Sequence, residues 1–184
     1  MIRKASVLMI AIVFLAGAAI AATASAGNVH LKGGKNAQLV FTDKGLTLSA
    51  SGDLAGLGNG DILVTLSATG NPTATCTNPG GKKQPPGQNP APVVLTGVQS
   101  LPQSQIKNGT VHFGQLITNA PVSPIPGAPG CPNHKWTEAI TNVSFTSAAI
   151  TVEQPAGTVV LTLTCTFTPA TSDGTVPKGN ISCQ

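Results

Sequence analysis

The chain has 184 residues and a formal net charge of +4, and only 9% of its residues are charged. Its one arginine is Arg3, it has one tryptophan, and it has no tyrosine. Nucleic-acid-binding proteins use arginine and stacking aromatic rings to contact phosphates and bases, so this composition argues against a nucleic-acid partner.

The N-terminus has the three parts of a secretory signal peptide. Two basic residues precede the apolar run 7–22, and Ala24-Ser25-Ala26 has the small-x-small pattern that signal peptidase cuts. We therefore predict a signal peptide at residues 1–26 and a mature chain of residues 27–184, secreted or on the extracellular cell surface. Cleavage removes both basic residues and leaves eight lysines against six acids, a formal charge of +2. No later run approaches the roughly 20 apolar residues of a spanning helix, so no membrane span is expected after cleavage.

Alternation of apolar and polar residues predicts a chain made of short strands. The predicted strands are, in chain order, 38–42, 46–51, 62–69, 93–98, 110–118, 136–140, 143–152 and 158–168. The apolar face of 62–69 continues in phase through Ala74 and Cys76, past a predicted break at Gly70-Asn71-Pro72. In 143–152 the apolar positions change from odd to even numbers, which predicts a bulge near 147–149.

The last predicted strand, 158–168, has the clearest pattern. Its apolar residues alternate with threonines, so we expect one core face and one threonine face. The core face is expected to contain Val159, Leu161, Leu163, Cys165 and Phe167.

The segments between the strands carry turn chemistry. Asn59-Gly60-Asp61 and Asn108-Gly109 are typical of tight turns, and the Pro-rich segments 78–92 and 119–132 are long irregular connections. Together with the strands, they predict one all-β domain at 27–184: a two-sheet antiparallel sandwich of Ig-like architecture with seven to nine short strands, expected to be a monomer. The tryptophan lies far from the first cysteine and there is no tyrosine, so we predict the architecture and not membership of the immunoglobulin superfamily.

The cysteines predict two disulfides in the oxidising compartment that the signal peptide implies. Four cysteines allow three pairings, and the sequence favours Cys76 with Cys131 and Cys165 with Cys183. Cys76 and Cys131 each adjoin a Pro/Gly loop, whereas Cys183 follows Cys165 by only 18 residues.

No residue pattern forces a metal site, a cofactor or a catalytic site, and none is predicted. His30, His112 and His134 stand apart in the sequence, and Asp53 and Asp61 lack the dense acidic repeat of calcium loops. A Gly-x-Ser-x-Gly elbow is absent.

The carboxylates available for acid–base chemistry lie mostly in turns or at strand ends, where solvated surface charge is the usual role. They are Asp43, Asp53, Asp61, Glu138, Glu153 and Asp173. Glu138 is the best single candidate because it lies beside Trp136 and near His134.

A possible binding surface is predicted from Lys82, Lys83, His134 and Trp136. A secreted sandwich that binds sugars commonly presents Trp or Tyr platforms, and Trp136 is the one such side chain here, although packing against the core or a disulfide is its more common role. If Cys76 pairs with Cys131, the disulfide joins the two Pro-rich loops and could create a shared interaction surface at that end of the sandwich.

Several segments resemble those of small exported β-rich proteins of actinobacteria, a group without an assigned function. The resembling segments are Leu54-Ala55-Gly56-Leu57-Gly58-Asn59-Gly60-Asp61, Cys76-Thr77-Asn78-Pro79-Gly80-Gly81, Pro86-Gly87-Gln88-Asn89-Pro90 and Cys131-Pro132-Asn133-His134-Lys135-Trp136-Thr137. The resemblance supports pairing Cys76 with Cys131, since both lie within these segments, and it implies no catalytic residues.

The sequence therefore favours a secreted, non-enzymatic β-sandwich with an interaction or structural role at the cell envelope or outside the cell. Its expected partner is a protein or a cell-wall glycan. Two alternatives stay open: a carbohydrate- or cell-wall-binding module that uses Trp136, and a small secreted hydrolase or inhibitor in which Glu138 acts.

Overall fold

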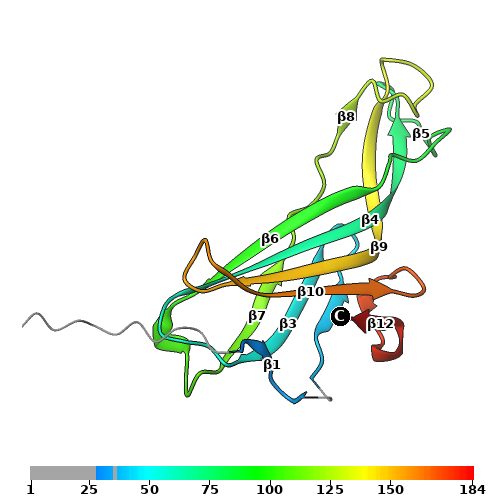
Figure 1. Ribbon diagram of the computed structural model, residues 1–184. Coiled ribbons are helices and arrows are strands. Elements are labelled where there is room, and N and C mark those ends of the chain that lie inside the picture. The colour runs from blue at the N-terminus through cyan, green and yellow to red at the C-terminus, as the bar shows by residue number, and fades with distance from the viewer. Residues whose placement is uncertain (1–27, 35–36) are drawn as a thin grey trace, which may run out of the picture.

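The computed structural model describes residues 28–34 and 37–184. The predicted signal peptide, residues 1–26, and the predicted first mature residue, Gly27, lie outside the described residues. The described chain is all-β and forms two antiparallel sheets (Figure 1), which confirms the predicted sandwich. The Ig-like label stays a prediction. Within the described ranges, no helix has the length and apolar character to cross a membrane.

The first sheet is built around β3. Strand β7 pairs with one edge of β3, while β2 and β1 pair with successive parts of the other edge, and β11 pairs with β2. The strands are β1 (His30–Leu31), β2 (Val40–Asp43), β3 (Leu48–Ala55), β7 (Val111–Ile117) and β11 (Gly174–Thr175).

The second sheet is built around two long neighbouring strands, β4 and β9. Its strands are β4 (Ile62–Thr77), β5 (Lys83–Gln84), β6 (Val93–Leu101), β8 (Ile125–Pro126), β9 (Thr137–Glu153), β10 (Val159–Phe167) and β12 (Ile181–Cys183). Strand β9 contains the predicted strand 143–152 and all of 136–140 except Trp136, which precedes it. Short 3₁₀ turns occur at Gln103–Gln105 and Lys178–Asn180.

Strands β4 and β9 continue beyond the sandwich as a projecting two-stranded ribbon (Figure 1, upper right). Strand β6 stops pairing with β4 at Gly70, and β10 stops pairing with β9 at Ser147, whereas β4 and β9 stay paired as far as Thr77 and Thr137. Beyond that point β5 and β8 take over the outer edges. We call this ribbon with its loops the arm, residues 71–92 and 121–142.

The break predicted at Gly70-Asn71-Pro72 is wrong, because β4 passes through these residues without interruption. The register is adjusted on β9 instead, where Thr146 and Thr141 are each an extra residue relative to β4. The bulge at Thr146 lies one residue before the predicted segment 147–149. Pro72 fits because β6 no longer pairs there and its partner Val143 donates its N–H to Gly45 O at 2.7 Å.

The core lies between the two sheets. Phe41 of β2 and Phe167 of β10 meet edge to face across it, with ring centroids 5.1 Å apart. On one side, a Cβ at Gly97 of β6 would lie 1.9 Å from the carbonyl oxygen of Ile117, so glycine alone permits this approach of β6 to β7. The largest fully buried side chains are Phe41, Phe113, Phe145, Leu48, Leu54, Ile62, Leu66, Leu116, Ile150, Val64, Val143 and Val152.

The core face predicted for 158–168 is buried only at its C-terminal end. Cys165 and Phe167 are buried, but Leu161 and Leu163 are half-buried and Val159 is 57% exposed. A register shift between Val159 and Leu161 turns Val159 out of phase with the core face, and β12 pairs along the edge of β10 only at Cys165–Phe167.

Asp43 is buried, in contrast to the solvated surface role expected of the turn carboxylates. It is 2% exposed, and its carboxylate accepts hydrogen bonds from the Thr171 hydroxyl and, at 2.9 Å, from Gly45 N. The Thr171 hydroxyl also accepts a hydrogen bond from Phe145 N at 2.8 Å. This network joins the turn after β2 to β9 and to the loop after β10.

Replacing Thr171 with valine is expected to lower the free energy of unfolding by about 2 kcal/mol, because the N–H of Phe145 and an oxygen of Asp43 would stay buried without a partner. Urea unfolding would measure the change. Thr164→Val on the exposed face of β10 is the matched control, expected within about 0.5 kcal/mol of the parent. Equal midpoints for the two variants would contradict this role of the network.

Both predicted disulfides are present. Cys76 pairs with Cys131 and Cys165 pairs with Cys183, and among the described residues no cysteine is free. The second disulfide joins directly opposite residues of β10 and β12. The first lies in the arm, far along β4 from the sandwich.

Candidate functional site

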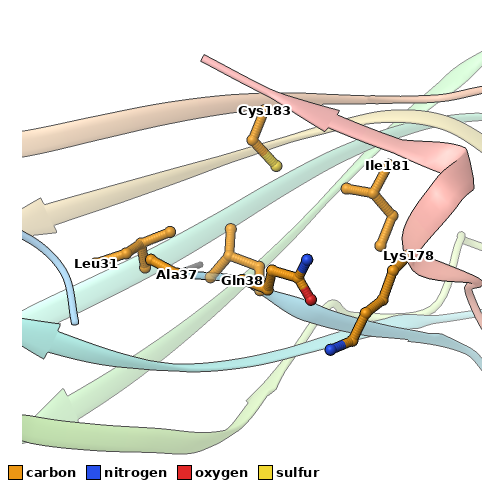
Figure 2. Close-up of a pocket in the computed structure, with 7 residues that line it drawn as sticks. Leu31, Ala37, Gln38, Lys178, Ile181 and Cys183 are labelled. Atoms are coloured by element: carbon orange, nitrogen blue, oxygen red, sulfur yellow. The ribbon is translucent and has the colours of Figure 1, made fainter. Parts of the chain in front are cut away.

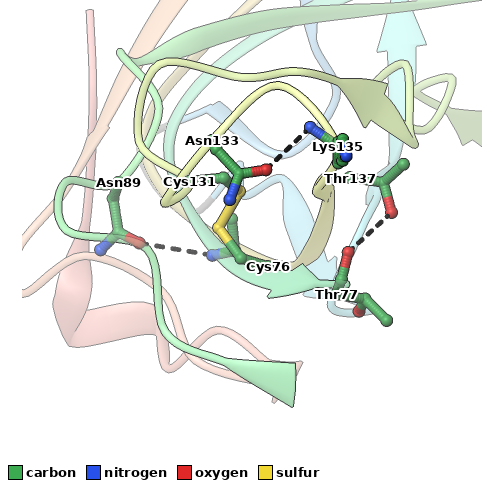
Figure 3. The surroundings of a disulfide bond; sticks show 8 residues. Cys76, Thr77, Asn89, Cys131, Asn133, Lys135 and Thr137 are labelled. Carbon is green, nitrogen blue, oxygen red and sulfur yellow. Dashed lines mark hydrogen bonds between the residues drawn. A yellow bond between two sulfur atoms is a disulfide. The ribbon is translucent and has the colours of Figure 1, made fainter. Parts of the chain in front are cut away.

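The Cys76–Cys131 disulfide closes the tip of the arm (Figure 3). Cys76 is the penultimate residue of β4, and Cys131 belongs to the loop between β8 and β9. The two cysteines and Ala128 form a small buried cluster against which Ile125 and Trp136 pack. This cluster is distinct from the sandwich core, and Ile125 packs against both.

The two Pro-rich loops meet at this tip. Gly87 of the first loop donates its N–H to Gly130 O of the second at 2.8 Å, and Asn89 Oδ1 accepts a hydrogen bond from Ala74 N at 3.4 Å. A Cβ at Gly130 would lie 2.5 Å from Gln88 O, so the loops approach too closely for any other residue there. The loops are therefore held to each other as well as to the ribbon.

A pocket of about 330 Å³ lies between the two loops. The first loop contributes Gln88, Asn89, Pro90 and Ala91, β8 and the loop after it contribute Ile125, Ala128, Pro129 and Gly130, and β9 contributes Glu138. All of these residues except Glu138 are uncharged. Among the described residues that line the pocket, Glu138 has the one ionisable side chain.

Glu138 lies in the middle of three paired strands. It is opposite Cys76 of β4 on one side and Ile125 of β8 on the other, and the same side of β9 carries the buried Ile140. Its residue surface is 4% exposed. Within the described part of the chain, Glu138 Oε1 is the one buried side-chain atom without a hydrogen-bond partner. A buried carboxylate oxygen without a donor is costly, which marks this pocket as a candidate ligand site.

All four residues of the predicted binding surface lie at the tip. Lys82 lies in the turn after β4, Lys83 is the first residue of β5, and His134 lies in the loop that leads to β9; all three are exposed. Trp136 is half-buried against the disulfide cluster, so it packs in the way expected of a structural tryptophan rather than standing out as a flat platform.

His112 lies beside one carboxylate, that of Asp53. Its Nδ1 lies 3.0 Å from Asp53 Oδ1, because the two residues are directly opposite each other on β7 and β3. Both side chains are more than half exposed, so we treat the pair as a surface contact of little energetic weight. Across residues 28–34 and 37–184, no group of three His, Cys, Asp or Glu side chains gathers to hold a metal.

A second hollow, of about 190 Å³, lies beside β1 and β12 (Figure 2), away from the arm (Figure 1). Its lining includes Leu31 of β1, Lys178 of the 3₁₀ turn, and Ile181 and Cys183 of β12. No carboxylate or unpartnered buried polar atom lines it in the described chain. The arm pocket is therefore the stronger candidate.

Comparison of the chain with models of known protein families, with curated proteins and with solved structures finds no match to any of them. The resemblance to exported actinobacterial proteins thus stays a prediction. What this protein can do has to be argued from its own geometry.

Sequence reasoning singled out Glu138 for its neighbours but placed most carboxylates in solvent. One signal was available: Glu138 has the same parity as Ile140, so an inward direction follows once 136–140 is a strand. The loop residues around it carried no such signal, because their meeting depends on the disulfide and on β8.

Proposed function

We propose that the protein is exported and acts outside the cell, at the envelope or in the medium, as a non-enzymatic binding protein. In this proposal the sandwich is the scaffold and the tip of the arm contacts a protein or cell-wall partner. The observation that carries the proposal is the tip itself: two loops held by a disulfide around a pocket whose buried carboxylate oxygen has no donor.

Three features support this role. Two disulfides suit an oxidising compartment, and the N-terminal pattern predicts export. The arm extends the sheet beyond the points where β6 and β10 stop pairing, and it carries both Pro-rich loops at its tip. Strained or unsatisfied groups that the fold does not need are expected at functional sites.

The proposal is tested by binding of the mature chain to envelope material from cells that produce it. A labelled chain with Lys82→Ala, Lys83→Ala and His134→Ala is expected to bind at least tenfold more weakly than the parent, since these exposed residues surround the tip. Sedimentation with washed envelopes, at increasing concentrations of labelled protein, measures the affinity.

The control carries the same three changes elsewhere: Lys44→Ala, Lys178→Ala and His30→Ala, all at exposed positions of the sandwich end. It should bind as the parent does. Saturable binding that both triple variants retain would place the contact surface away from the arm and contradict the proposal.

The two alternatives predict different results. A sugar-binding module would lose glycan binding on Trp136→Ala while its disulfide cluster stayed intact. A hydrolase would turn over a substrate panel and lose that turnover on Glu138→Gln; glycoside hydrolysis ordinarily uses two carboxylates, whereas Glu138 is the one carboxylate among the described residues of the pocket.

A further inference from the structure

Resting on the proposed function, we propose that the arm pocket binds the ammonium group of a lysine side chain carried by a peptide or protein partner. The group that would receive it is the carboxylate of Glu138, which lines the pocket.

The Glu138 carboxylate in the pocket would be stabilised by a cationic hydrogen-bond donor. Glu138 is 4% exposed, and its Oε1 accepts no hydrogen bond from any described residue. The lysines at the same end, Lys82, Lys83 and Lys135, are exposed and do not pair with it. An incoming ammonium would supply both the hydrogen bond and the opposite charge, which are the two requirements of a buried carboxylate.

The apolar side chains of the pocket lining suit a ligand that carries an apolar chain next to its ammonium group. Pro90, Ala91, Ile125, Ala128 and Pro129 line the pocket together with Glu138. A lysine has four methylene groups before its ammonium, so it could bury its stem against these walls while its charge reaches the carboxylate. A bare divalent cation fits less well, because calcium takes six to eight oxygen ligands and Glu138 is the one carboxylate among the described lining residues.

The surface beside the pocket indicates that the amine belongs to a larger partner. A shallow apolar depression shares Pro90 and Ile125 with the pocket and continues over Val94 and Val122. Val94 is 63% exposed and Val122 is 87% exposed. Exposed apolar surface next to a charged pocket is typical of protein-binding sites, and a free small amine would leave it uncovered.

Binding is tested with a printed library of lysine-centred heptapeptides of otherwise varied sequence, probed with the labelled mature chain. Each peptide stands beside two copies in which the central lysine is Nε-acetylated or replaced by norleucine. The best lysine peptide is then measured by calorimetry and is expected to bind at least tenfold more tightly than either copy, because both lack the charge.

The protein variants are Glu138→Gln and its control Glu153→Gln, the same chemical change at the other end of β9. Glu138→Gln is expected to weaken the lysine peptide at least tenfold, and Glu153→Gln less than twofold. Without peptide, Glu138→Gln is expected to raise the melting temperature by about 3 °C, because it removes an unpaired buried charge. If the carboxylate had a purely structural role, Glu138→Gln would instead lower the melting temperature.

Three results would overturn the assignment. The first two are that the acetylated peptide binds as tightly as the lysine peptide, or that Glu138→Gln binds the lysine peptide as tightly as the parent does. The third is that n-butylammonium binds as tightly as the best peptide, which would make the occupant a small free amine. These results are distinguishable from failure of the proposed function. Arm-dependent envelope binding that persists while lysine peptides fail contradicts only the ligand class; loss of arm dependence contradicts the function itself.

Discussion

Removal of the arm disulfide by Cys76→Ala together with Cys131→Ala is expected to lower the free energy of unfolding by about 4 kcal/mol, because the bond closes a long loop that the unfolded chain would otherwise sample freely. The two cysteines are 55 residues apart. Cys76 is also fully buried in the tip cluster, so its removal loosens the packing of Ala128 and Trp136. Guanidinium unfolding under non-reducing conditions measures the loss.

The same double variant is expected to change the tip more than the sandwich. Hydrogen exchange should become faster in the loops 86–91 and 127–136. The amides of β3 and β7 should still exchange only through global unfolding of the domain. Cys165→Ala with Cys183→Ala is the matched control; it opens a separation of only 18 residues, is expected to cost about 3 kcal/mol, and should leave the tip loops unchanged. Equal protection of the tip loops in both variants would show that the disulfide does not hold the tip.

Replacing Phe41 with alanine is expected to lower the free energy of unfolding by about 3–5 kcal/mol. Phe41 is fully buried on β2 of the first sheet, and its ring contacts Phe167 on β10 of the second sheet. The substitution therefore leaves a cavity between the sheets and removes an aromatic contact across them.

The measurement for Phe41→Ala is the urea midpoint, and Val122→Ala serves as the surface control, since Val122 is 87% exposed. Val122→Ala should stay within about 0.5 kcal/mol of the parent. A loss below about 1 kcal/mol for Phe41→Ala would contradict close packing of the two sheets at this point.

The strands could be predicted from the sequence wherever an apolar face alternates with a polar one. Ile62, Val64 and Leu66 define such a face on β4, and their phase continued through Cys76 as predicted. The Asn108-Gly109 turn was also recognisable, and both residues have the positive φ that a tight hairpin turn requires. These signals are local, so one sequence is enough to reveal them.

The arm could not be predicted in this way. Gly70 and Pro72 have the local chemistry of a break, yet they stay in the strand because β9 supplies a partner from more than 70 positions further along the chain and absorbs the mismatch with two bulges. Burial of Asp43 and Glu138 was missed for a similar reason. The burial of each depends on segments distant in sequence: Thr171 for Asp43, and the two Pro-rich loops for Glu138.

We propose that this protein meets its partner at the tip of the arm, around Glu138. The most direct measurement is a ¹H–¹⁵N NMR titration of the mature chain with the best lysine peptide. We predict that the amide shifts cluster at Gln88, Ala91, Ala128, Gly130 and Glu138, the lining of the pocket. Shifts that cluster instead on β10 and β12, or that persist unchanged in Glu138→Gln, would contradict the claim.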